Sequence, residues 1–208
     1  MSRQKVTTLY QFDELSDKAK ERARDWYREG SAGDNYFAEA VIEDADRMAA
    51  ILGFRIRRHT VKLMGGGTRE DPSIWWSLGY TQSDGAWIEA MYEYSADACA
   101  KIREEAPEDT VLHTLADELH ALQGAYTFEL TASVKDDDRG PMDLCLEHPE
   151  LDVPEEAYKA FREIVRDFER WIYKQLRAED EYRSADAQVD ETIRANEYEF
   201  TVDGKRED

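Results

Sequence analysis

The sequence predicts an α+β fold in which an antiparallel sheet is packed by several helices. Three observations carry this prediction: an aromatic hairpin over residues 73–95, an irregular interleaving of strand-like and helix-like segments, and a long helical segment near the C-terminus. Hairpins are more evident than strand–helix–strand crossovers, which argues against a parallel sheet. We expect a single α+β domain over residues 1–208, with the helical segment 154–196 packing as an appendage.

The central hairpin contains two runs of strand-forming residues around Ser83-Asp84-Gly85. A three-residue hairpin loop usually ends in a left-handed residue, and Gly85 fits that position. The resulting register places Trp76 opposite Tyr92 and gives the ribbon one apolar face, because side chains alternate between the two faces of a strand. The more polar face carries Trp75, Trp87, Glu89, Met91 and Glu93.

In the N-terminal third of the chain, the sequence pattern predicts a short strand over residues 6–12 and two helices. Ser16 is the expected N-cap of the first helix, which ends near Gly30. The second helix begins after Asp34, and Gly53 ends it in the usual C-terminal glycine position.

The remainder of the chain begins with residues 54–63, an alternating strand that contains the concentrated basic segment Arg55-Ile56-Arg57-Arg58-His59. We expect its arginines to pair with carboxylates on neighbouring strands and helices. The glycine-rich residues 65–73 predict a loop. The other expected elements are helices at 96–105 and 109–123, strands at 126–134 and 142–146, a long helix from Pro154, a helix at 185–196 and a strand at 198–202.

The composition favours a basic partner. The 208 residues include 47 acidic and 27 basic side chains, giving a formal charge of -20. Such a charge repels nucleic acid and anionic lipid, so neither is expected as a direct partner. No apolar run reaches the length of a membrane span, and the N-terminus has no apolar signal core. The two cysteines, Cys99 and Cys145, are expected as free thiols in a reducing cytoplasm.

Candidate catalytic features are few. His113, Asp117 and His120 fall on one side of a helix and form a possible metal cluster, although that side lies opposite the leucine face and should meet solvent. The loop from Gly65 lacks the lysine of a phosphate-binding loop. Cys145 has no neighbouring base or cation that would activate it. We therefore expect no cofactor and no catalysis, with a metal-dependent enzyme using the His/Asp cluster as an alternative.

Three segments together resemble a family of small acidic proteins encoded by bacteriophages and prophages, some of which are labelled antitoxin-like. They are YQFDELSDKAKERARDWYRE near the N-terminus, TQSDGAWIEAMYEY in the hairpin and DETIRANEYEFTVDGK near the C-terminus. The usual turn in that family reads Gln-Gly-Asp-Gly, and Ser83 replaces the first glycine here. The resemblance implies a role inside an infected bacterial cell and carries over no catalytic residues.

These observations predict a phage-derived binding protein that inhibits a host nucleic-acid-handling or defence protein, of restriction or CRISPR type. Carboxylates would occupy a basic surface, as a nucleic-acid mimic does. An antitoxin-like partner that neutralises a basic toxin remains an alternative. The oligomeric state is left open. The candidate partner-binding residues are Trp75, Trp87, Glu89, Glu93, Asp136, Asp137, Asp138, Glu179, Asp180 and Glu181.

Overall fold

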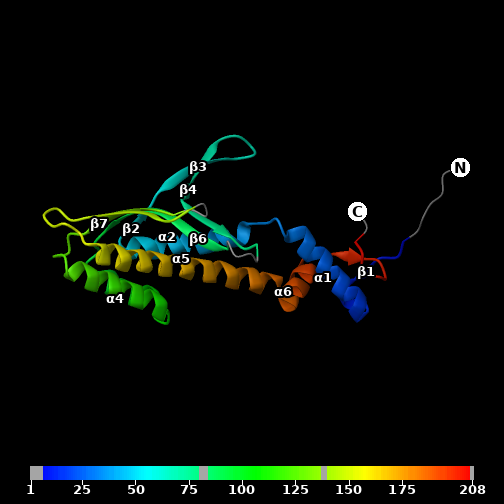
Figure 1. Cartoon of the computed structure of the whole chain (residues 1–208). Coiled ribbons are helices and arrows are strands. Elements are labelled where there is room, and N and C mark those ends of the chain that lie inside the picture. The colour runs from blue at the N-terminus through cyan, green and yellow to red at the C-terminus, as the bar shows by residue number, and fades with distance from the viewer. Residues whose placement is uncertain (1–6, 80–83, 137–139, 207–208) are drawn as a thin grey trace. The chain divides into compact units, whose positions relative to one another are not determined.

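The computed structural model describes residues 7–79, 84–136 and 140–206 and confirms the α+β fold (Figure 1). The chain forms two compact units. The terminal unit consists of Met1–Phe37 and Ala178–Asp208, and the central unit consists of Ala38–Arg177. Where the sequence suggests one domain with an appendage from residue 154, the boundary between the units falls at residue 178, inside the long helix α5 (Glu155–Ser184).

The central unit is built on an antiparallel sheet in the order β2-β6-β7-β8, with β5 also paired to β6. Strand β6 (Gly85–Glu93) lies in its middle. The strands on either side are β2 (Phe54–Ile56), β5 (Ile74–Ser77), β7 (Thr131–Lys135) and β8 (Asp143–Glu147). The helices of this unit are α2 (Tyr36–Leu52), α3 (Ala98–Glu105), α4 (Thr110–Gly124) and most of α5.

One face of this sheet, the inner face, packs on helices α2, α4 and α5 (Figure 1). Phe54 stacks on Phe168 of α5 with ring centroids 6.0 Å apart, and Tyr92 meets Phe161 edge to face at 5.0 Å. Such aromatic pairs stabilise the folded state beyond what the burial of their apolar surface contributes. The core of the central unit therefore lies between β2, β6 and α5.

The hairpin register differs from the prediction. Trp76 lies opposite Ala86 rather than Tyr92, six positions further along β6. Gly85 is the first residue of β6 and has no left-handed backbone. Instead the Asp84 carboxylate accepts hydrogen bonds from the Ser77 hydroxyl (3.2 Å) and the Gly79 N–H (3.0 Å). These bonds favour a longer connection, part of which, including Ser83, lies outside the described residues.

The predicted faces of the hairpin are nevertheless largely confirmed, because a shift of six residues is even and leaves every side chain on its original face. Trp76 is only half-buried, as is Tyr94, which follows β6. The buried side chains on the inner face are Ile74, Ala86, Ile88, Ala90 and Tyr92.

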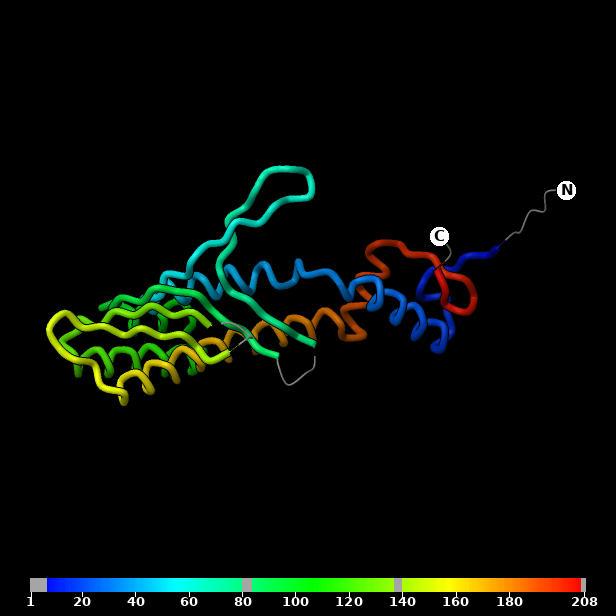
Figure 2. Tube along the Cα trace, turned by 45° about the horizontal axis from the view of Figure 1, so that its top comes forward, coloured from blue at the N-terminus to red at the C-terminus, as the bar shows by residue number. Residues whose placement is uncertain are grey.

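The predicted basic strand 54–63 divides into two strands. After β2, the chain leaves the sheet as β3 (Arg58–Lys62) and returns as β4 (Thr68–Pro72). The two strands form an arm that extends away from the sheet in two views (Figures 1 and 2). The prediction of a loop over 65–73 is thus wrong for β4. The turn of the arm contains Gly66 and Gly67 at positive φ.

The predicted strand from Tyr126 begins late. Thr127 and Phe128 have positive φ, and the Phe128 N–H donates to the Gln123 carbonyl at 2.9 Å, so these residues finish helix α4. The buried Gln123 side chain then holds the backbone N–H and C=O of Leu130. Strand β7 begins only after this turn.

The terminal unit pairs a segment of the N-terminal part of the chain with one of the C-terminal part. Helix α1 (Asp17–Ser31), with Ser16 as its N-cap as predicted, lies beside α6 (Asp186–Ala195), and β1 (Tyr10–Gln11) pairs with β9 (Glu199–Phe200). A short 3-10 helix, Phe12–Glu14, replaces the end of the predicted first strand. The core of this unit consists of Phe12, Leu15, Ala19, Ala23, Val189, Ile193 and Phe200.

Candidate interaction surface

The second face of the central sheet, here called the outer face, is uncovered: no helix in the described part of the chain lies over it (Figure 1). Its side chains follow from the register of β2, β5, β6, β7 and β8. They are exposed or half-buried, and they include Arg55, Arg57, Trp75, Trp87, Glu89, Met91, Glu93, Ser133, Lys135, Asp143, Cys145 and Glu147.

Two tryptophans stand opposite each other on the outer face. Trp75 of β5 pairs across the strands with Trp87 of β6. Trp75 is 39% exposed and stacks on the His59 ring at 5.7 Å, whereas Trp87 is half-buried and packs against Gly85. The structure thus brings together the two predicted aromatic anchors on an open surface.

The predicted glutamates of this face already have cationic partners. Glu89 pairs with Arg57 at 2.9 Å, and Glu93 lies 3.9 Å from Arg55. Glu89 also stands opposite Lys135 of β7, which stands opposite Asp143 of β8. Opposite charges directly across strands stabilise a sheet. This confirms the predicted pairing of the basic segment, and it leaves Glu89 and Glu93 with less free charge for a partner.

Asp136 does not form part of an exposed acidic surface. It is 8% exposed and lies against Glu169 of α5, which is also buried. Its predicted partners Asp137 and Asp138 lie outside the described residues. Asp136 follows the end of β7, and its backbone N–H donates to the Ile88 carbonyl at 3.0 Å. This bond holds the residue beside the sheet, so its side chain is buried.

Glu169 accepts a hydrogen bond from the Ile88 N–H at 3.1 Å. Burial, reinforced by the nearby Asp136, raises the pKa of Glu169 from its ordinary 4.5 to about 9. At neutral pH this side chain is a carboxylic acid, so it can donate a hydrogen bond to Asp136 while it accepts one from β6. No sequence pattern indicates this pair, because the two residues meet only through the fold.

A cluster without cationic partners lies at the end of the sheet where β8 leads into α5. We call it the acidic end: Glu147, Glu150, Asp152, Glu155 and Glu156. All five side chains are exposed, and none forms an ion pair within the described residues. Glu129 lies nearby, 3.7 Å from His148. Sequence reasoning missed this cluster, although the run EHPELDVPEE shows its charge density.

The predicted acidic group near the end of α5 belongs to the terminal unit. Glu181 is exposed, whereas Glu179 and Asp180 are half-buried. Asp180 pairs with Arg183 at 2.9 Å. These three residues therefore belong to a different unit from the outer face.

The metal candidates do not form a metal site. Among the described residues no group of three or more His, Cys, Asp or Glu side chains is placed to hold a metal ion. His113 Nε2 lies 2.8 Å from the Ala106 carbonyl, and His120 Nδ1 lies 3.0 Å from the Tyr94 hydroxyl. Asp117 binds Arg103 at 2.7 Å, which lowers its pKa.

We expect equimolar Zn²⁺ to leave the melting temperature of the protein unchanged, because each of these three side chains already has another partner. Differential scanning calorimetry with and without the ion checks this. Stabilisation by Zn²⁺ that is lost in H120A would contradict the geometry.

The two cysteines lack the features of a nucleophile. Partial burial and Asp117 raise the pKa of Cys99, while desolvation and Glu147 raise that of Cys145. Both thiols are therefore protonated at neutral pH, when only a thiolate reacts readily. They are free, and Cys145 points outward from β8.

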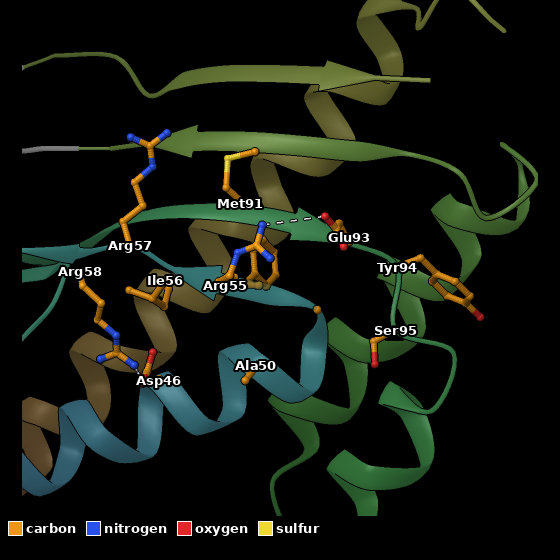
Figure 3. A pocket seen from close by; sticks show the side chains of 12 residues that line it. Asp46, Ala50, Arg55, Ile56, Arg57, Arg58, Met91, Glu93, Tyr94 and Ser95 are labelled. Atoms are coloured by element: carbon orange, nitrogen blue, oxygen red, sulfur yellow. Dashed lines mark hydrogen bonds and ion pairs between the residues drawn. The ribbon is translucent and has the colours of Figure 1, made fainter. Parts of the chain in front are cut away.

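A groove of about 720 Å³ runs along β2 at the edge of the sheet (Figure 3). Asp46 and Ala50 of α2 lie on one side of it, and Met91 and Glu93 of β6 lie on the other. Three arginines from the predicted basic segment line it: Arg55, Arg57 and Arg58.

These features define an α+β protein whose central unit has one packed and one uncovered sheet face. Residues 37–186 match the family model described as a domain of unknown function (DUF8835), which covers well over half of the chain. The protein belongs to this family. The match includes the whole central unit and little of the terminal unit. Comparisons with curated proteins and with solved structures found no match. No helix within the described residues is long and apolar enough to cross a membrane.

Proposed function

We propose that this chain is a binding protein without catalysis, which occupies a basic surface of a nucleic-acid-handling protein in a bacterial cytoplasm. The observation that carries the proposal is the acidic end, where five exposed carboxylates have no cationic partner among the described residues. Elsewhere many carboxylates of the central unit are neutralised by arginines, such as Glu89 by Arg57. Within residues 147–156, five exposed carboxylates thus lie close together without a cationic partner among the described residues.

Electrostatics supports the choice of a basic partner. The formal charge of -20 attracts a basic protein from a distance, and an unpaired cluster directs it to one site. Carboxylates spaced along a loop and the first turn of a helix can take the places of successive phosphates. The phage resemblance makes a defence protein that binds DNA or RNA the expected target.

The two tryptophans can contribute to the same interface. Trp87 lies six residues before Glu93 on β6, a separation of roughly 20 Å along a strand. A standard interface of about 800 Å² on each partner extends over such a distance. Exposed aromatic side chains that become desolvated commonly supply much of the binding energy. We assign steering to the acidic end and anchoring to Trp75 and Trp87.

The experiment is capture of partners from a bacterial lysate on the immobilised protein at low salt, followed by elution with increasing salt. The variant E147Q/E150Q/D152N removes three charges of the acidic end. The matched variant E104Q/E108Q/E118Q removes three charges from exposed positions on or near α3 and α4. Both variants change the net charge equally, so a difference between them reports position rather than total charge.

We expect the wild type and the matched variant to retain a nucleic-acid-handling protein that salt releases, and the acidic-end variant to lose it. The absence of any such protein at low salt would overturn the proposal, as would equal retention by both variants. Retention of a basic toxin that does not handle nucleic acid would instead favour the antitoxin-like alternative.

A further inference from the structure

We propose that the outer face of the sheet binds a second copy of this chain, with the two copies related by a two-fold axis that runs parallel to the strands between β6 and β7. The side chains of this face are exposed or half-buried, and no helix among the described residues lies over them (Figure 1). The observation that carries the proposal is the order of charges across the face. The purified chain alone tests it, so the proposal does not depend on the function proposed above.

One row of side chains, here called the charged row, crosses the whole sheet with alternating charge. Glu89 of β6 stands opposite Lys135 of β7, which stands opposite Asp143 of β8. On the other side of Glu89, Arg57 follows β2 and forms an ion pair at 2.9 Å. From the β2 edge to the β8 edge, the order is therefore positive, negative, positive, negative.

A two-fold axis parallel to the strands matches this order with its own reverse. Such an axis lays β2 of one copy over β8 of the other and β6 over β7, and it keeps each row at the same height along the strands. Arg57 then faces Asp143 of the second copy, and Lys135 faces Glu89 of the second copy. Each contact occurs twice, as a two-fold interface requires. A two-fold axis along the charged row itself would instead place Arg57 over Arg57, so the charges favour the first arrangement.

The neighbouring row places uncharged side chains next to the axis. Met91 of β6 stands opposite Ser133 of β7, and both are half-buried. In the dimer, Met91 lies over Ser133 of the second copy. The centre of the interface therefore contains no charge that would have to be desolvated.

The dimer also joins two edge charges that are poorly satisfied within one copy. Arg55, at the β2 end of the Met91 row, is 73% exposed and lies 3.9 Å from Glu93. Cys145 is at the β8 end of that row, and the exposed Glu147 follows it on the same face. Because Arg55 lies over Cys145 of the second copy, its guanidinium can reach Glu147 of that copy diagonally.

The arm leaves the middle of the outer face free. Arg58 lies 2.6 Å from Asp46, and Arg69 lies 3.1 Å from Glu39. Both carboxylates belong to α2, which packs on the inner face, so these contacts hold the arm at the β2 edge (Figure 2). Two twisted sheets can then pack about 10 Å apart with their strands about 30° from parallel.

We expect the dimer to be weak. Ion pairs at an interface fix orientation more than they add affinity, and a face of four short strands is smaller than a standard interface. Each copy carries a formal charge of -20, but at about 0.15 M salt the Debye length is about 8 Å, so this repulsion is screened while pairs in contact remain. The expected Kd is on the order of 10 μM.

The test exchanges charges between two variants of the full chain, R57E and D143K, and follows association by sedimentation velocity from about 1 μM to about 200 μM. The wild type should shift from the 24.1 kDa monomer to a dimer as its concentration rises. Each variant alone brings like charges together twice and should associate at least about tenfold more weakly. An equimolar mixture should dimerise like the wild type, because the new carboxylate of R57E then faces the new ammonium of D143K.

Two further pairs of variants make the result decisive. K101E and E104K change the charge equally at exposed positions on α3, and each should associate like the wild type. E89K and K135E apply the same exchange next to the axis, and only their mixture should dimerise. The proposal is overturned if the wild type stays monomeric or grows beyond a dimer, if R57E or D143K alone associates like the wild type, or if neither mixture recovers the dimer.

Discussion

Replacement of Glu169 by glutamine is expected to stabilise the protein above about pH 5 and to remove the part of the wild type's pH dependence that comes from this group. Glu169 is a buried acid whose pKa lies near 9 in the folded chain and near 4.5 when the chain unfolds. Between these values the folded state binds one more proton than the unfolded state. Wild-type stability therefore falls as pH rises through this window, by up to about 1.4 kcal/mol per pH unit.

In E169Q, the glutamine side chain can form both hydrogen bonds that Glu169 forms. Its amide oxygen can accept from the Ile88 N–H, and its amide nitrogen can donate to Asp136. Because glutamine releases no proton on unfolding, E169Q should exceed the wild type by about 3 kcal/mol at pH 7 and match it near pH 4. E169A loses the acceptor for the Ile88 N–H and should be less stable than E169Q at every pH, by about 1–3 kcal/mol.

Urea unfolding at several pH values measures these differences. Comparison of E169Q with the wild type isolates Glu169 together with its contact to Asp136, because carboxylates away from this pair titrate equally in both. A difference between the two proteins that does not change from pH 4 to pH 9 would contradict the buried acid.

The second large effect is expected at Gly53, between α2 and β2. Gly53 has φ +100, and a Cβ there would overlap the Glu93 carbonyl oxygen. The Gly53 carbonyl itself accepts the hydrogen bond from the Glu93 N–H that starts the β2–β6 pairing. G53A must therefore strain the backbone and push β2 from β6, which we expect to cost about 3 kcal/mol or more.

Gly66, in the turn of the arm, provides the matched control. It has a similar φ of +85 but nothing within 4 Å of the added Cβ. G66A should therefore lower the free energy of unfolding only by the cost of a left-handed backbone at alanine, about 1 kcal/mol. Equal loss of stability in the two variants, measured by denaturant unfolding, would show that the close approach to Glu93 is not what requires glycine at position 53.

The sequence predicts the faces of the hairpin better than its register. Side-chain alternation assigns Ile88 and Tyr92 to the core, and any even shift preserves that assignment. The predicted register depends on the turn residues, yet Asp84 binds Gly79 and Ser77 across a longer connection. Strand β4 escaped prediction for another reason: Thr68–Pro72 is almost wholly polar, and only its pairing with β3 makes it a strand.

The candidate site shows a similar limit. Sequence reasoning could place Trp75 and Trp87 on the same face of the hairpin, because both follow from alternation within it, but it could not show that this face is open. It could not place Asp136 beside Glu169, or show that Arg57 neutralises Glu89, since these contacts join segments far apart in the chain. Charge density alone does not separate paired carboxylates from unpaired ones. The acidic end is distinguished only once the ion pairs are known.

The central claim is that the acidic end occupies a surface on which the partner binds nucleic acid. The direct measurement is competition: the captured partner is bound to a labelled oligonucleotide, and the protein is titrated in while fluorescence anisotropy follows release of the oligonucleotide. We predict complete displacement by the wild type and by E104Q/E108Q/E118Q, and little by E147Q/E150Q/D152N. Formation of a ternary complex, in which the partner holds oligonucleotide and protein together, would contradict the claim.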